Sequence, residues 1–186
     1  MTDIFSDNDI MLQVKSGQID KLGLLYERHK KPLFGFLYRM HRSPELCEDM
    51  VQTVFTKILH SKHTFTGEGK FSSWMYHIAR NVSYDSFRKH SNTKEDSLEQ
   101  QEQEFATTEN LEAEVSIEEE NNLLAIAMNQ LKPQQKEVLI MSRYENRKYI
   151  EIGEILGCSE GAVKMKIRRA LLDLRTLFLK LEKGNE

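Results

Sequence analysis

Residues 149–170 read YIEIGEILGCSEGAVKMKIRRA, and this stretch has the pattern of two helices joined by a tight turn. Apolar residues that recur at helical spacing are predicted to face a core, namely Ile150, Ile152, Ile155 and Leu156 before the turn and Val163, Ile167, Leu171 and Leu174 after it. Gly157 is typical of a left-handed helix end, and Ser159 is typical of the cap that starts the next helix. The stretch therefore predicts a helix-turn-helix.

The second predicted helix has a basic outer face. Four cations fall largely outside its apolar stripe, namely Lys164, Lys166, Arg168 and Arg169. In a helix-turn-helix the second helix enters the DNA major groove, where its first turns read bases and its cations bind phosphates. The pattern favours DNA binding, and the alternative that this stretch alone leaves open is a helical hairpin with a solvated basic face.

The composition of the chain is typical of an all-α protein with one or two domains. Its 186 residues include only three prolines and nine glycines, and no strand-like alternation is bounded by turn signals. The acidic N-terminus lacks an apolar run, so we expect neither a signal peptide nor membrane insertion. Cys47 and Cys158 lie far apart without a partner motif, which predicts reduced thiols and a cytoplasmic location.

Sequence motifs for catalysis and for cofactor binding do not occur in this chain. It contains no HExxH, phosphate-binding glycine loop or nucleophile elbow. His60 and His63 have one-turn spacing but lack a nearby cysteine or carboxylate partner, which disfavours a metal site. We therefore expect a protein that is not an enzyme and needs no cofactor.

Charge is segregated along the chain, although the net charge is only −3. Residues 1–90 carry 13 Lys/Arg against 10 Asp/Glu, and residues 121–186 carry 12 against 8, whereas residues 91–120 hold one Lys and 11 Asp/Glu. Exposed charges are largely screened beyond about 8–10 Å at physiological salt, so local charge decides what binds a phosphate. Two mildly basic segments thus flank an acidic one.

The N-terminal segment is predicted to form an independent domain of four helices, at about residues 7–16, 20–40, 44–60 and 71–89. Ser43, Pro44 and Glu45 give a strong start signal for the third helix: a cap, a proline at the first helical position and an acid in the first turn. The fourth helix places polar groups, among them aromatic rings, an amide and cations, on partly exposed positions outside its apolar stripe, at Ser73, Tyr76, His77, Arg80, Asn81, Tyr84 and Arg88. Such groups suit an unpaired base, but helical proteins often expose them without that function.

Two stretches resemble the extracytoplasmic-function group of bacterial RNA polymerase sigma factors. Residues 47–89 resemble region two of that group, and the matching positions are Asp49, Gln52, Phe55, Trp74, Ile78, Ala79, Asn81, Asp85 and Arg88. Residues 131–175 resemble region four, and the two regions occur in the expected order. Thr53 departs from the pattern because the group usually has a glutamate there, and the lost charge bears on polymerase contact.

The resemblance implies an all-α protein with two helical domains. Residues 1–90 would form the region-two domain, 91–116 an acidic flexible linker, and 117–186 the region-four helix-turn-helix domain. The protein would direct core RNA polymerase to promoter DNA, recognise the minus-thirty-five and minus-ten elements, and promote strand opening. An anti-sigma protein would be a further partner.

The resemblance also implies roles for single residues. Asp49, Gln52 and Phe55 would belong to the surface that binds the polymerase clamp. The melted minus-ten element would be bound by His63, Phe65, Tyr76, Arg80 and Asn81. The minus-thirty-five element would be bound by Ser159, Lys164, Met165, Arg168 and Arg169. Trp74 is expected mainly in the core, and Asp85 is expected to pair with Arg88 or to act as a cap.

The acidic segment has two possible uses. The resemblance implies that it occupies the basic RNA channel of the polymerase before RNA does, and the alternative is a solvated spacer. At its end, Ser116 and Glu119 have the spacing of a capping box that starts the C-terminal domain.

Two other classes of function fit parts of the sequence. A stand-alone helix-turn-helix regulator would need a ligand pocket or a phospho-acceptor cluster in its other domain, and neither signal is present. A polymerase-binding antagonist would keep the surface around Asp49 and Gln52 but lose the basic helix, which is intact here.

Overall fold

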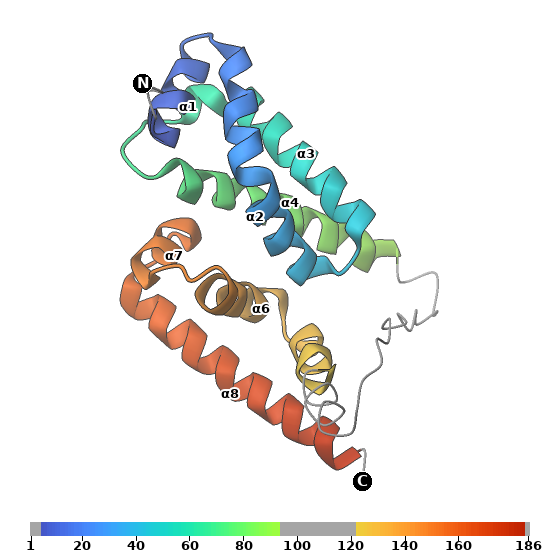
Figure 1. Cartoon of the computed structure of the whole chain (residues 1–186). Helices are drawn as coiled ribbons and strands as arrows, with labels where there is room; N and C mark the ends of the chain where they lie inside the picture. Colours follow the sequence, from blue (N-terminus) through green and yellow to red (C-terminus); the bar gives the residue numbers. More distant parts are fainter. Residues whose placement is uncertain (1–4, 94–121, 185–186) are drawn as a thin grey trace, which may run out of the picture.

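The computed structural model describes residues 5–93 and 122–184, which form two helical lobes without a strand in either range (Figure 1). The N-terminal lobe, residues 5–93, consists of α1 (Asp7–Lys15), η1 (Ile19–Lys21), α2 (Leu22–His41), α3 (Pro44–Ser61), η2 (Lys62–Thr64) and α4 (Phe71–Thr93). The C-terminal lobe, residues 122–184, begins with a helical segment at 122–130 and continues with α6 (Pro133–Leu139), η3 (Ile140–Tyr144), α7 (Tyr149–Leu156) and α8 (Glu160–Gly184). The predicted all-α class is confirmed.

Local signals set most helix ends of the N-terminal lobe. The backbone N–H of Leu46 donates to the Ser43 hydroxyl at 3.4 Å, and Pro44 is the first residue of α3, which confirms the predicted start. The second helix begins two residues later than predicted, because residues 19–21 form a 3-10 turn. Helix α4 continues to Thr93, four residues beyond its predicted end. The rest of the predicted linker and the capping box at Ser116 lie outside the described residues.

Contacts from α1 fix the start of α4. The Asn8 side chain donates to the Gly69 carbonyl at 2.7 Å, and its Oδ1 accepts from the backbone N–H of Phe71 at 2.7 Å. Asn8 therefore satisfies a free amide at the first turn of α4 from 63 residues away. Behind this contact, apolar faces of α1, α2, α3 and α4 form the core of the lobe.

The predicted helix-turn-helix is present in α7 and α8. Gly157 adopts the left-handed conformation with φ 65°, and the Ser159 hydroxyl accepts from the Ala162 N–H at 3.2 Å. The turn is so close that a Cβ on Gly153 would lie 2.6 Å from the Cys158 carbonyl oxygen. The sequence therefore predicted both caps correctly.

Two predicted core positions in this motif are wrong. Ile150 is 59% exposed and Leu171 is 37% exposed. The buried face of α8 follows Val163, Ile167 and Ala170, and Leu171 lies one residue beyond that stripe. Ile150 follows the first residue of α7, whose buried side is formed by Ile152 and Ile155.

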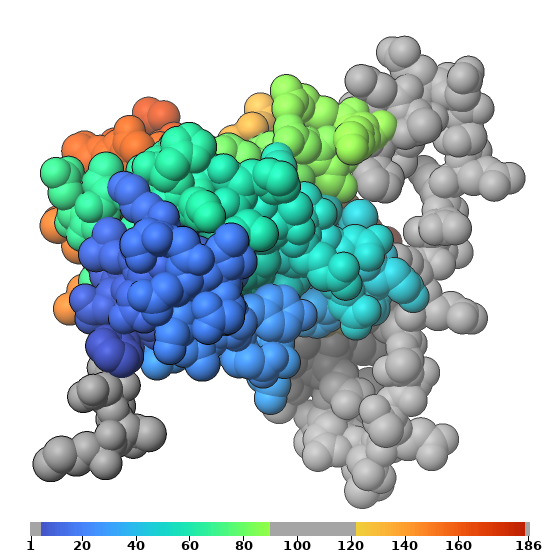
Figure 2. Space-filling view, turned by 90° about the horizontal axis from the view of Figure 1, so that it is seen from above, coloured from blue at the N-terminus to red at the C-terminus, as the bar shows by residue number. Residues whose placement is uncertain are grey.

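The two lobes pack against each other. Helix α7 contacts α4, while α6 and η3 contact α2, and α8 lies on the outer side of the C-terminal lobe (Figure 1). Viewed from above, the N-terminal lobe covers most of the C-terminal lobe (Figure 2). None of the helices in the described ranges is sufficiently long and apolar to cross a membrane.

Candidate nucleic-acid and polymerase surfaces

Tyr76 lies in the contact between the lobes and not on a free surface. Its side chain is 1% exposed, and its hydroxyl donates to Glu145 Oε2 at 3.0 Å. The Arg147 guanidinium lies 3.8 Å from the centre of the ring, and Phe36 packs against the ring edge. Burial, with the nearby Glu145 carboxylate, raises the pKa of Tyr76 to about 12. The predicted partial exposure of Tyr76 is wrong, because the C-terminal lobe covers this face of α4.

Arg80 and Tyr84, one turn further along α4, both bind Glu137 of α6. Arg80 Nε lies 2.6 Å from Glu137 Oε1, and the Tyr84 hydroxyl donates to Oε2 at 2.5 Å. Glu137 is only 1% exposed. Burial raises the pKa of Glu137 above its usual value, although Tyr84 and Arg80 act in the opposite direction. The Glu137 carboxylate thus pairs with both Arg80 and Tyr84. These two side chains lie on the face of α4 whose residue types suit an unpaired base.

Helix α7 covers the beginning of α4 with two further acids. The Ser73 hydroxyl donates to Glu154 Oε2 at 2.8 Å, and Lys70 forms an ion pair with Glu151. Ser73 is buried by this contact, which corrects its predicted exposure. The acids of the C-terminal lobe that contact the N-terminal lobe are thus Glu137, Glu145, Glu151 and Glu154.

Asn81 and Arg88 have exposed side chains on α4, as predicted. Asp85 pairs with Arg88, and its Oδ2 also lies 3.5 Å from Lys57 Nζ. The hydrogen bond from Arg88 lowers the pKa of Asp85. The predicted pairing of Asp85 with Arg88 is confirmed.

The loop before α4 presents His63 and buries Phe65. His63 is exposed, whereas the Phe65 ring packs 5.2 Å from the half-buried ring of Trp74 and also contacts Phe71. The Phe65 carbonyl accepts from Lys15 Nζ at 2.6 Å. Phe65 is therefore part of an aromatic cluster in the core, and direct contact with DNA would require this cluster to open.

The exposed side of α3 contains Asp49 and Gln52, as predicted. Gln52 also lines a hollow of about 340 Å³ between α2 and α3, together with Tyr26, Lys30, Lys31, Phe34, Glu48 and Val51. Phe55 is buried, and its ring packs edge-on against Tyr26 at 5.0 Å. Phe55 thus lies beneath this surface and supports Tyr26, which corrects its expected place on the surface.

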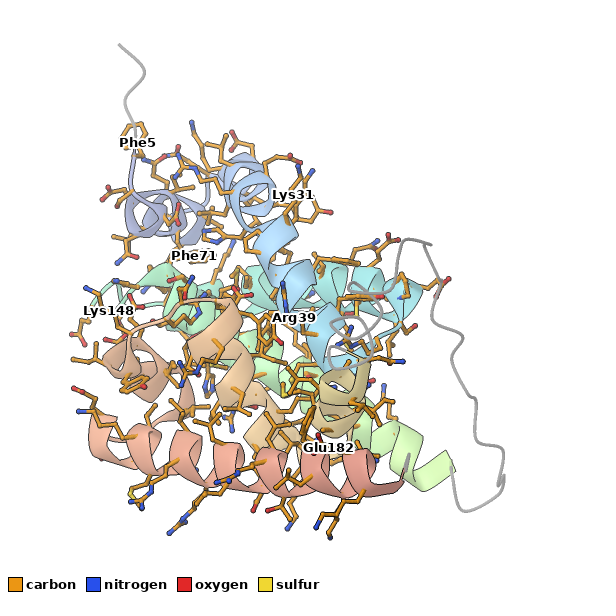
Figure 3. The ribbon with its side chains drawn as sticks, turned by 60° about the horizontal axis from the view of Figure 1, so that its bottom comes forward. Phe5, Lys31, Arg39, Phe71, Lys148 and Glu182 are labelled. Carbon is orange, nitrogen blue, oxygen red and sulfur yellow. The ribbon has the colours of Figure 1, made fainter. Side chains whose placement is uncertain are left out.

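The basic face of α8 is exposed. Lys164, Met165, Arg168 and Arg169 are all accessible, and side chains project from α8 on the side away from the other helices (Figure 3). Lys164 Nζ pairs with Glu160 at 2.8 Å. A hollow of about 400 Å³ beside this face is lined by Arg143, Tyr149, Lys164, Ile167, Arg168, Leu171, Leu172 and Arg175. Arg143 and Arg175 were not predicted to belong to this face, although Arg175 follows Arg168 by two helical turns.

No cluster of three or more His, Cys, Asp or Glu side chains suitable for a metal lies within residues 5–93 or 122–184. The acids that bind α4 were also not predicted. Glu137 directly precedes an apolar run at 138–141, and an acid at the edge of such a run is the one local signal that could have indicated a buried partner.

Each of the two lobes matches a known protein family. The profile of Sigma-70 region 2 matches residues 25–93, and that of Sigma-70, region 4 matches residues 122–174. The chain is 30% identical to the RNA polymerase sigma factor CarQ of Myxococcus xanthus over 92% of this chain and 97% of that protein. It is also 30% identical to the ECF RNA polymerase sigma factor SigW of Bacillus subtilis, over 88% of this chain and 91% of that one.

Two solved structures share the fold. CnrH in complex with the cytosolic domain of CnrY matches with a TM-score of 0.67 at 22% identity, covering 92% of this chain and 96% of that chain. The sigma factor RpoE in complex with the anti-sigma factor NepR, from Bartonella quintana, matches with a TM-score of 0.60 at 23% identity, covering 85% and 94%.

Proposed function

This chain belongs to the extracytoplasmic-function sigma factors of RNA polymerase, and on that premise we propose which of its surfaces carries each step of promoter-specific transcription initiation. The observation that carries the proposal is the exposed basic face on the second helix of the helix-turn-helix. Lys164, Arg168 and Arg169 bind the minus-thirty-five element as duplex DNA in the major groove, with Ser159 and Met165 at the N-terminal turns of the same helix.

Core polymerase binds the exposed side of α3. Asp49 and Gln52 supply polar contacts. The adjacent hollow is lined in part by apolar side chains and aromatic rings, which a side chain of the partner can cover. Phe55 contributes indirectly, since it holds the Tyr26 ring at the edge of this hollow. Thr53 is exposed beside these residues and offers no charge, and its hydroxyl donates to the Asp49 carbonyl at 2.8 Å.

The melted minus-ten strand binds along α4 and the loop before it. Asn81 and His63 are exposed in the present structure, whereas Tyr76 and Arg80 are engaged by Glu145 and Glu137. Tyr76 and Arg80 therefore bind DNA after the lobes separate. Phe65 positions the loop from within the aromatic cluster.

The chain divides for these tasks into a region-two domain that ends with α4 at Thr93, an acidic linker that follows α4 as far as residue 116, and a region-four domain at 117–186. It is not an enzyme, uses no cofactor and acts in the cytoplasm. An anti-sigma protein is a further partner, since the CnrH and RpoE structures of the same fold each contain a bound protein, named as an anti-sigma factor in the latter.

Run-off transcription tests this function. Core polymerase with the protein should produce a defined transcript from a matching promoter, selected from a genomic fragment library, and core polymerase alone should not. The double variant Arg168→Ala and Arg169→Ala, which changes only exposed side chains, should abolish the transcript. A stand-alone regulator would instead protect a discrete operator in a footprint without polymerase and yield no transcript.

A further inference from the structure

A cavity of about 380 Å³ lies in the joint between the two lobes, and three cations line it. Arg39 and Arg42 come from the end of α2, and Lys136 comes from α6 of the other lobe. The remaining lining residues are apolar, aromatic or glycine, namely Gly35, Tyr38, Leu124, Ala125, Met128, Ile140 and Tyr144. The lining of this cavity thus combines three positive charges with two aromatic rings and contains no acid.

Lys136 brings a buried charge to the cavity. Its side chain is 6% exposed, and its Nζ donates to the Met40 carbonyl at 2.9 Å and to Asn129 Oδ1 at 2.7 Å. These bonds use two of the three N–H groups of the ammonium, and neither partner carries a negative charge. A buried charge is costly unless an opposite charge pairs with it, so Lys136 favours an anion in the cavity.

Arg42 adds a second charge that is incompletely satisfied. Its Nε is buried and has no hydrogen-bond partner within the described residues, and its guanidinium lies 5.9 Å from the centre of the Tyr38 ring. Burial lowers the pKa of Lys136, and the charge of Arg42 lowers it further. The two cations therefore repel each other, and an anion between them would remove this repulsion.

Arg39, labelled in Figure 3, is only partly neutralised. Its Nη1 donates to the Gly35 carbonyl at 3.0 Å and lies 3.8 Å from the Glu145 carboxylate. Its guanidinium lies 5.0 Å from the centre of the Tyr144 ring. Glu145 also accepts the hydroxyl hydrogen bond of Tyr76, so this single carboxylate does not balance three cations.

We propose that this cavity is a binding site for a small ligand that carries two or more phosphate groups. A phosphate group presents several acceptor oxygens and about two negative charges, which match guanidinium and ammonium donors. The cavity volume lies within the range of small-molecule pockets. Tyr38 and Tyr144 offer aromatic surface to the rest of the ligand, and a nucleotide base suits such a surface.

This site goes beyond the function proposed above, because none of its lining residues belongs to the surfaces assigned to DNA or to core polymerase. Its cations come from both lobes, so a bound ligand contacts α2 and α6 at the same time. A ligand that binds only the folded protein stabilises it. The melting temperature should therefore rise with the concentration of the ligand.

Isothermal titration calorimetry of the full-length protein tests the site, with sodium pyrophosphate, ADP and adenosine as probes in a buffer without phosphate. Pyrophosphate supplies the phosphate groups alone, ADP adds the base and the sugar, and adenosine lacks the phosphates. Arg39→Gln, Arg42→Gln and Lys136→Met each remove one charge from the cavity. Lys180→Met, at an exposed lysine of α8, is the matched control for Lys136→Met. Circular dichroism checks that each variant stays folded.

We expect pyrophosphate and ADP to bind and adenosine not to bind. Each cavity variant should weaken the binding of both by about tenfold or more, because it removes a charged donor, and Lys180→Met should bind as the wild type does. Tighter binding of ADP would identify a nucleotide as the ligand, equal binding would identify the phosphate groups alone, and either result retains the site. The site would be overturned by absence of saturable binding, by adenosine binding as tight as that of ADP, or by unchanged binding in the folded cavity variants.

Discussion

The Tyr76 hydroxyl of α4 donates a 3.0 Å hydrogen bond to Glu145, which directly follows η3, so a residue of the N-terminal lobe is tied to one 69 positions away. The Tyr76 ring lies between Phe36 of its own lobe and Arg147 of the other. Tyr76 therefore belongs to two structures at once: the core of the region-two lobe and the joint with the region-four lobe.

Tyr76→Phe should separate these two contributions. The ring contacts remain, but Glu145 loses a donor in a largely buried site, so the free energy of unfolding should fall by about 1–2 kcal/mol. Guanidinium chloride denaturation measures this loss. Tyr144→Phe is the control, since Tyr144 is half exposed, and it should leave stability within about 0.5 kcal/mol of the wild type. Equal stability of all three proteins would mean that the hydroxyl contributes nothing to the joint.

Promoter opening and binding of duplex DNA should depend on different lobes. Asn81→Ala should impair promoter opening, seen as reduced permanganate reactivity of melted thymines, because an amide can donate to and accept from one base edge. Duplex binding through Lys164 and Arg168 should persist. A lost contact of this kind costs about 1–3 kcal/mol, or roughly tenfold or more in the opening equilibrium. Normal melting on several promoters would mean that Asn81 does not bind a base and that its amide has a structural role.

Arg168→Ala should give the opposite phenotype, with weak closed-complex binding and near-normal opening once bound. A bidentate contact with guanine would cost about 1–3 kcal/mol at one base pair only. A phosphate contact would instead weaken all sequences alike and reduce the salt slope by about one. Titration of duplex DNA at several salt concentrations distinguishes these cases, and Arg169→Ala should be measured in parallel. Wild-type binding by both variants would mean that the DNA-binding face lies elsewhere.

The double variant Asp49→Ala and Gln52→Ala should lower affinity for core polymerase while the fold stays intact, since both side chains are exposed on α3. Pull-down with tagged core polymerase measures the effect, and duplex DNA binding by the isolated protein should not change. His60→Ala, exposed at the other end of α3, is the control and should bind normally. Full polymerase binding by the folded double variant would exclude this surface.

Gly153→Ala should destabilise the helix-turn-helix. Its Cβ would lie 2.6 Å from the backbone carbonyl oxygen of Cys158, and backbone cannot move aside as a flexible side chain can. We expect a loss of about 1–3 kcal/mol in the free energy of unfolding. Gly161→Ala, whose Cβ would meet only the Ser159 hydroxyl at 3.9 Å, should be neutral or stabilising, because alanine favours a helix over glycine. A neutral Gly153→Ala would show that the turn can widen.

Local patterns predicted the helices and the turn of this protein well, because their determinants are close in sequence. Ser43 and Pro44 start α3, and Gly157 ends α7 in the left-handed conformation, as expected from residue type alone. The exposed cations of α8 also follow from periodicity, since Val163 and Ile167 fix the buried face.

Burial at the joint could not be predicted in this way. Helical periodicity tells which residues share a face, but it does not tell whether a second lobe covers that face. Tyr76 was therefore expected to be accessible, although Glu145 and Arg147 enclose it. The same limit applies to Arg80, whose partner Glu137 lies 57 residues away and whose pairing depends on how α6 docks.

Lys136 should make stability depend on pH in a defined window. Burial, with the nearby Arg42 charge, lowers the pKa of Lys136 from 10.5 to about 8. Below about pH 8 the lysine is charged in both the folded and unfolded states, and the full cost of burying the charge is present. Between pH 8 and about 10.5 the unfolded chain binds more protons, so the contribution of Lys136 to the free energy of unfolding rises with pH.

Lys136→Met removes this titration and keeps a side chain of similar length. The free energy of unfolding, wild type minus variant, should therefore increase from pH 7.5 to 9.5, by at most about 1.4 kcal/mol per pH unit. Cys47, whose pKa burial raises to about 11, acts in the opposite direction, but it does so in both proteins and cancels in the difference. Urea denaturation at four pH values gives the two curves. Parallel curves would mean that Lys136 keeps its usual pKa, and that the Met40 carbonyl and Asn129 satisfy the charge without cost.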